Sequence, residues 1–334
     1  MIYNYAVNKY YLDGTSTNES SSLLETALYI TESEGKMFDS LINIDFMDTL
    51  QEAESDFGKK KSIIEVVKNI AKKIVELLQK VWNAIVNAFK TLVEKLASML
   101  SSTKSLADKY RSYVTDSKNL KGFEGLDDFP KDLFGADAYE VPSYQKFISI
   151  ADNLPDKNVD ARKSSLEQIS KHIETALENH NKAFRKAFET GKFVPDAAFM
   201  KTCCDKASDG KKHFIDAINK QKDENLKGVD AARKGAKQQQ AKADSAKAAD
   251  PDYAAAWRDY YTALSKIANY ITSDAHIQIN AVKLQFKAIR RAIVVVGKYA
   301  YAQAKGTGKA NESVEYAELL GYKSDAYVES VLGI

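Results

Sequence analysis

One apolar stripe runs through residues 63–100, a stretch that contains neither proline nor glycine. Successive stripe residues are 4, 3, 4, 4, 3, 4, 4, 3, 4 and 4 positions apart: Ile63, Val67, Ile70, Ile74, Leu78, Val81, Ile85, Phe89, Leu92, Leu96 and Leu100. Equivalent positions recur every eleven residues, which is about 3.67 residues per turn, so the stripe stays on one side of a straight helix. The spacing predicts a long amphipathic α-helix over about 62–100 and disfavours a left-handed heptad coil.

The polar face of this predicted helix is basic, with seven lysines from Lys61 to Lys95 against three glutamates. Such a helix can pack in the core of a bundle, lie in an anionic membrane interface, or enter a groove of a partner protein. Core packing is the commonest of these. The residues that would make a partner or membrane contact are Ile63, Ile74, Trp82, Ile85 and Phe89 on or near the stripe, with Lys72, Lys73 and Lys80 beside it.

Charge is segregated along the chain although the whole chain carries only +2. Residues 1–58 carry a net charge of −9, and residues 59–118 carry +8. We therefore divide the sequence into an N-terminal helical region, 1–118, with an acidic opening, and a connector, 119–160, that holds three of the five prolines. A C-terminal helical bundle, 161–310, and an acidic tail, 311–334, follow.

Helical periodicity returns after the connector, and residues 253–304 predict one or two long helices. Residues 221–250 hold almost no large apolar side chains, so they predict an exposed helix or a mobile linker. No strand or hairpin pattern is found. The predicted fold class is all-α, an elongated helical bundle.

The residue types of catalytic and metal sites are present without the spacing that such sites need. His172, His180, His213 and His276 lie in no HExxH pattern, and Cys203 and Cys204 are adjacent, which disfavours a disulfide between them. The run Gly306-Thr307-Gly308-Lys309 lacks the remaining residues of a phosphate-binding loop. We predict no catalytic, cofactor or metal site and no enzyme activity.

Basic residues also gather near the C-terminus, in a stretch that has no acidic residue: Lys283, Lys287, Arg290, Arg291, Lys298 and Lys305. We expect a solvated basic face that acidic segments of the same chain neutralise, and any contact with nucleic acid would be nonspecific, through phosphates. The N-terminus has neither the basic nor the apolar region of a signal peptide, and no stretch of eighteen uncharged apolar residues occurs. We therefore expect a chain that is not secreted through a signal peptide.

Residues 16–115 contain the runs 19–25 (ESSSLLE) and 31–38 (TESEGKMF), the basic amphipathic helix and the run 106–110 (LADKY). These features carry a resemblance to internal virion proteins of large tailed bacteriophages. It implies a non-enzymatic protein of the particle, present in the host cytoplasm during assembly, that contacts other virion proteins or itself. It also implies maturation cleavage after Glu25, in a Leu-x-Glu context.

Two other functions remain open on the sequence. One is a membrane-active helical protein, such as a pore former or toxin, that inserts residues 63–100. The other is a phage-encoded protein that binds and inhibits a host factor.

Overall fold

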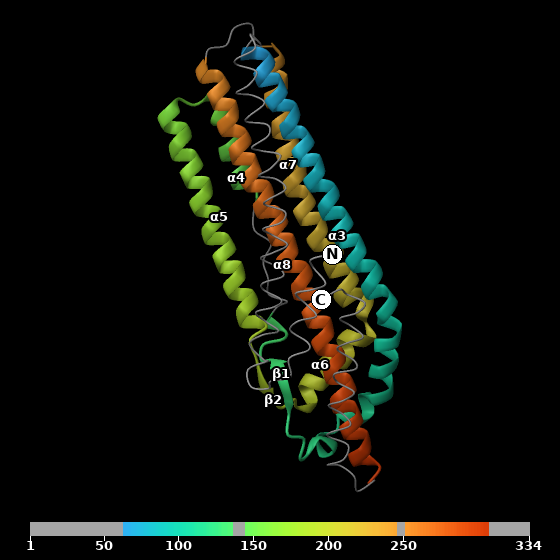
Figure 1. Cartoon of the computed structure of the whole chain (residues 1–334). Coiled ribbons are helices and arrows are strands. Elements are labelled where there is room, and N and C mark those ends of the chain that lie inside the picture. The colour runs from blue at the N-terminus through green and yellow to red at the C-terminus, as the bar shows by residue number, and fades with distance from the viewer. Residues whose placement is uncertain (1–62, 136–143, 246–250, 307–334) are drawn as a thin grey trace, which may run out of the picture.

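The computed structural model describes residues 63–135, 144–245 and 251–306, and it confirms the all-α, elongated helical bundle (Figure 1). Two helices run along the bundle: α3, Ile63–Val114, has 52 residues, and α8, Pro251–Ala304, has 54. At about 1.5 Å per residue they are about 78 and 81 Å long. The remaining helices pack around this pair.

The shorter helices are α4 (Gln145–Asp152), α5 (Val159–Ala187), α6 (Ala197–Ser208) and α7 (Ala217–Ser245). A π-helical segment, Lys211–Asp216, joins α6 to α7, and 3-10 turns lie at Ser117–Leu120 and Leu154–Asp156. In Figure 1, α3, α5 and α8 run in the same direction along the bundle, and α7 runs in the opposite direction.

Contacts between distant residues fix these directions. Arg290 of α8 donates to Thr103 of α3 at 2.6 Å, and Gly297 of α8 packs on Tyr110 further along α3, so the two long helices are parallel. α7 is antiparallel to α3, because Arg233 of α7 lies over the ring of Trp82 while Lys68 pairs with Asp244 near the end of α7.

The eleven-residue stripe forms the buried face of α3. Nine of its eleven residues are buried, and only the two terminal ones, Ile63 and Leu100, are partly exposed. The helix continues fourteen residues past the predicted end, because Thr103, Ala107, Tyr110 and Val114 extend the buried face at helical spacing. The core is continuous from α3 through α8 and includes residues from both sides of the connector.

The prediction of an exposed helix or mobile linker over residues 221–250 is wrong for the part that α7 covers, because one face of α7 is buried. The described part of this segment is a helix packed between α3 and α8. Its buried face consists mainly of small residues: Gly228, Ala232, Gly235, Ala236 and Ala243. The two glycines let the side chains of Tyr144 and Asp152 lie close to the helix backbone, and a search for large apolar side chains does not detect such a face.

The prediction of no strands is also wrong in one place. β1 (Leu126–Pro130) and β2 (Thr190–Phe193) form a two-stranded antiparallel sheet, with Leu126 opposite Phe193 and Pro130 opposite Thr190. The register shifts between Leu126 and Phe129, and Asp128 has a φ of 50°. Strands of five and four residues with an irregular register carry no alternating apolar pattern for the sequence to reveal.

Candidate functional site

A polar cluster lies inside the bundle where α4, α5, α7 and α8 meet; we call its five residues, Tyr144, His180, Asn225, Asp274 and Gln278, the Asp274 cluster. The Asp274 side chain has no exposed surface. One of its carboxylate oxygens accepts hydrogen bonds from the Tyr144 hydroxyl at 2.5 Å and the Gln278 amide at 2.7 Å. The other lies 2.9 Å from Nδ1 of His180.

The cluster extends to α7 through Asn225. Oδ1 of Asn225 lies 2.7 Å from the Tyr144 hydroxyl, whose single proton either Asn225 or Asp274 can accept, and the Asn225 amide donates to Gln278 at 2.9 Å. Beside the cluster the ring of Tyr270 stacks on His180, with centroids 6.3 Å apart. Burial and the carboxylate of Asp274 both raise the pKa of Tyr270. Asp274 of α8 thus contacts Tyr144 at the start of α4 and His180 of α5, and Asn225 of α7 joins the cluster through Tyr144 and Gln278. A buried polar network of this kind favours one arrangement of the helices.

A half-buried carboxylate, Asp152, lies at the end of α4. Asp152 accepts from the Tyr260 hydroxyl of α8 at 2.7 Å, and its backbone carbonyl accepts from Gln239 of α7. Burial raises the pKa of Asp152, and the hydrogen bond from Tyr260 lowers it in part. Burial, and then the adjacent carboxylate, raise the pKa of Tyr260.

Arg162 holds the first turns of α5 against α8. Its side chain is 1% exposed, and it donates to both carboxylate oxygens of Asp252, at 2.6 and 3.1 Å, and to Asp259 at 2.8 Å. The hydrogen bond to Asp252 is the main cause that raises the pKa of Arg162, and it lowers the pKa of Asp252. A planar guanidinium is suited to this two-carboxylate arrangement.

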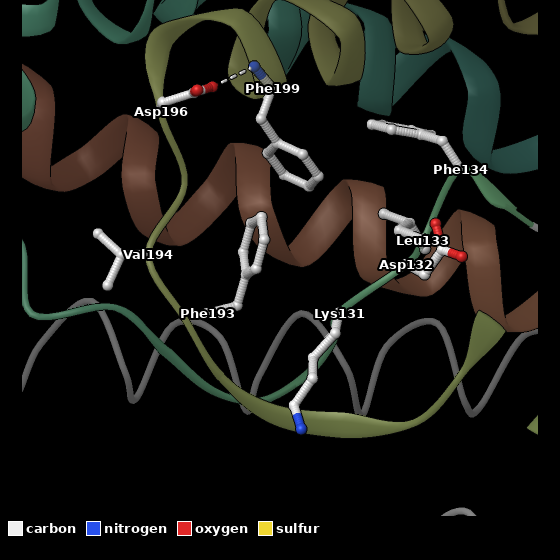
Figure 2. A pocket seen from close by; sticks show the side chains of 8 residues that line it. All are labelled: Lys131, Asp132, Leu133, Phe134, Phe193, Val194, Asp196 and Phe199. Atoms are coloured by element: carbon white, nitrogen blue, oxygen red, sulfur yellow. Dashed lines mark hydrogen bonds between the residues drawn. The ribbon is translucent and has the colours of Figure 1, made fainter. Parts of the chain in front are cut away.

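A hollow opens on the surface beside the small sheet, and Figure 2 shows the eight residues that line it. Its volume is about 330 Å³, at the lower end of the range of small-molecule pockets. Most of the lining is apolar: Leu133, Phe134, Phe193, Val194 and Phe199. Three charged residues, Lys131, Asp132 and Asp196, complete it. No part of this hollow was predicted from the sequence.

The residues proposed for a partner or membrane contact divide into two groups. Ile74, Ile85 and Phe89 are buried in the core, while Ile63 and Trp82 are partly exposed and pack against it. The lysines lie outside the core: Lys72 and Lys80 are exposed, and Lys73 is half-buried. Lys72 is 3.7 Å from Glu76 one turn later. The candidate cleavage residue Glu25 lies outside the described residues.

Two members of the C-terminal basic stretch are engaged inside the protein. Arg290 donates to Ser102 and Thr103 of α3, and Arg291 donates to the carbonyl of Asp128 in β1 at 3.4 Å. These contacts use arginines that the sequence suggested as phosphate ligands to join α8 to its neighbours.

The two cysteines are buried free thiols on α6. Burial raises the pKa of Cys204 to about 11 and that of Cys203 well above its ordinary value, so neither is poised as a thiolate near neutral pH. Across residues 63–135, 144–245 and 251–306, no group of three or more His, Cys, Asp or Glu side chains is placed to hold a metal ion.

The Asp274 cluster was not predicted, although His180 was noted as one of four histidines. Its members come from residues 144, 180, 225, 274 and 278, and no local spacing relates them. Asp274 and Asn225 are completely buried, so no ligand reaches them in this conformation. Within this conformation the cluster positions helices, and the accessible candidate for binding is the hollow.

Comparison of the chain with protein-family models, with curated proteins and with solved structures gives no match. None of the helices in the described part of the chain combines the length and apolar character needed to cross a bilayer.

Proposed function

We propose that this chain is a non-enzymatic structural or cargo component of a bacteriophage particle that acts through contacts with other particle proteins or with itself. The resemblance of residues 16–115 to internal virion proteins supports a location in the phage particle. The elongated shape of the bundle supports a structural role there.

The observation that carries the proposal is the pairing of two helices about 80 Å long in one continuous core. Arg290 and Gly297 join α8 to the distal part of α3, and Arg162 and the Asp274 cluster join α5 to α8 along its first half. A bundle whose helices contact one another along their whole length is stiff. It can therefore hold partners at its two ends a fixed distance apart. That property suits a component of an assembly.

The membrane-active alternative requires the apolar stripe to leave this core. Ile74 and Ile85 are at most 1% exposed, so inserting them into lipid would first expose the facing side chains of α7 and α8 to water. This cost favours a protein-contact role for the folded chain. No observation on the structure favours the host-inhibitor alternative over the particle component.

Mass spectrometry of purified phage particles tests the proposal. We expect peptides of this chain in particles that have been freed of lysate by density-gradient centrifugation. We also expect a peptide that begins at Thr26, produced by cleavage after Glu25. Particles without the chain would overturn the proposal.

A pair of variants separates packaging from cleavage. Glu25→Gln should abolish the peptide that begins at Thr26, whereas Glu19→Gln, in the same Ser-rich run, should leave it unchanged. If full-length chain is packaged with residues 1–25 attached, the cleavage prediction is wrong and the particle role stands.

A further inference from the structure

Val194 is the most exposed large apolar side chain among the described residues, at 61%. It follows β2 directly and lines the hollow of Figure 2, whose other apolar members are less exposed. Because Val194 lines the hollow together with four other apolar residues, its exposed side chain belongs to one contiguous apolar surface, and such surfaces occur at contact sites. An exposed apolar side chain, Val194, and an apolar hollow therefore lie on the same face of the protein.

The segment that carries Val194 is held on both sides. Before it, Phe193 pairs with Leu126 and its ring stacks on Phe129, with centroids 5.3 Å apart. After it, Pro195 restricts the backbone, and Asp196 caps α6 by accepting from the Phe199 N–H at 2.7 Å. Val194 is thus presented by a fixed backbone, which lowers the entropy lost on binding.

The hollow is also built from fixed side chains. The ring of Phe199 lies 4.7 Å from that of Phe193 and 5.2 Å from that of Phe134, measured between centroids. The Lys206 ammonium lies over the ring of Phe134, 5.4 Å from its centroid. Figure 2 shows the rings of Phe193 and Phe199 directed toward each other, with Phe134 across the opening. Fixed aromatic walls of this kind accept an aliphatic side chain.

Two neighbouring residues on the rim, Lys131 and Asp132, carry opposite charges, and both are exposed. The Lys131 ammonium is 3.2 Å from Glu189, but the two side chains are 54% and 65% exposed, and a pair of that exposure contributes little. In a two-fold contact each residue of one copy meets the complementary residue of the other. Lys131 of each copy can then pair with Asp132 of the other while each Val194 enters the opposite hollow.

We propose that this face is a two-fold contact between two copies of the chain, in which Val194 of each copy occupies the hollow of the other. A contact centred on one side chain and one charge pair per copy is small, so the dimer is weak and forms at high concentration. Such a contact suits a component that is crowded within an assembly. It does not depend on the particle proposal, because a monomer can be packaged and a dimer can be absent from particles.

Sedimentation velocity of the full chain over a hundredfold range of concentration tests this contact. We expect the wild type to shift from monomer toward dimer as concentration rises, and Val194→Asp to weaken association at least tenfold. Val159→Asp is the matched control, because Val159 is also exposed, at 43%, but begins α5 and lies outside the hollow. It should associate like the wild type.

A charge-exchange experiment tests the pairing. Lys131→Glu and Asp132→Lys should each weaken self-association, because each places like charges opposite one another in the dimer. An equimolar mixture of the two variants should recover association, because both cross-copy pairs are then opposite in sign. Raising the salt concentration should reduce this recovery.

Three results would overturn the proposal: a wild type that stays monomeric throughout, a Val194→Asp variant that associates as the wild type does, or a mixture that recovers nothing. A monomeric wild type whose thermal stability falls on Val194→Asp would assign the hollow to the chain's own residues instead. Val194→Thr, which keeps the side-chain shape, serves if the aspartate variant does not fold; it should weaken association and leave the melting temperature unchanged.

Discussion

α5 and α7 are both 29-residue helices that lie against α8, yet they are held there by different interactions. α7 packs between α3 and α8, and the side chains of Tyr144, which precedes α4, and of Asp152 in α4 lie close to Gly228 and Gly235 of α7. α5 contacts α8 and α4 through a few larger apolar residues and through polar contacts at Arg162 and His180. One helix is positioned mainly by shape and the other largely by charge.

The difference predicts how each interface fails. A shape-based interface is intolerant of added atoms and insensitive to salt, because close packing leaves no room. A charge-based interface tolerates changes of volume and is sensitive to the loss of a partner. The Asp274 cluster belongs to both interfaces, because Asp274 lies against His180 of α5 and is linked to Asn225 of α7 through Tyr144.

Replacing the shared carboxylate should have the largest effect. Asp274→Ala removes the acceptor of the buried Gln278 amide and the carboxylate that lies beside Tyr144 and His180 in the core. We expect a loss of about 3–5 kcal/mol in the free energy of unfolding, measured by urea denaturation. Asp230→Ala, which removes an exposed partner of Lys234 on α7, should cost less than about 1 kcal/mol. A loss below 1 kcal/mol for Asp274→Ala would show that the cluster does not join the two interfaces.

Adding one methyl group to the α7 interface should come next. A Cβ at Gly228 would lie 2.5 Å from Cδ2 of Tyr144, and the position of the Tyr144 hydroxyl is restricted because it lies between its two acceptors, Asn225 and Asp274. We therefore expect Gly228→Ala to lower the free energy of unfolding by about 2–3 kcal/mol. Alanine is otherwise favoured over glycine in a helix by about 1 kcal/mol.

The exposed face of the same helix provides the control for this variant. Gln238→Ala should change the free energy of unfolding by less than about 0.5 kcal/mol. Stabilisation by Gly228→Ala would mean that helix propensity outweighs the close approach, and that α7 is not positioned by shape.

Removing the charge at the start of α5 should have a smaller and more local effect. Arg162→Met keeps much of the side-chain volume but loses the bonds to Asp252 and Asp259, whose carboxylates can hydrate because they are 50% and 33% exposed. We expect a loss of about 2 kcal/mol and faster amide hydrogen exchange in α5 than in α7. Lys182→Met removes only an exposed pair with Glu178 and should change neither. Equal acceleration in both helices would contradict a separate charge-based interface.

Alkaline pH should weaken the α4–α8 contact by the smallest amount. The pKa of Tyr260 is raised in the folded state, so the folded chain keeps a proton that the unfolded chain loses above about pH 10. Stability from this group is therefore present below that pH and falls as pH rises, by at most about 1.4 kcal/mol per pH unit. Tyr260→Phe should be less stable near neutral pH but show a shallower decline between pH 9.5 and 10.5. An unchanged slope would exclude Tyr260 as a contributor.

Local periodicity determined the long helices of this protein. The eleven-residue stripe located α3 and its buried face, because both follow from the spacing of side chains along one helix. The end of α3 at Val114 was missed, since Thr103 and Ala107 are weak apolar signals that become buried only when α6 and α8 cover them.

Tertiary structure alone decided what the small and polar residues do. Glycines and alanines between 221 and 245 gave no apolar pattern, and their value lies in the close approach of a neighbour that the sequence does not identify. His180 and Asp274 are 94 positions apart, and Val194 meets its hollow through residues 131–134, so folding alone brings each set together. Apolar spacing is a local property of a chain, whereas a hydrogen-bonded cluster or a hollow depends on which distant residues become neighbours.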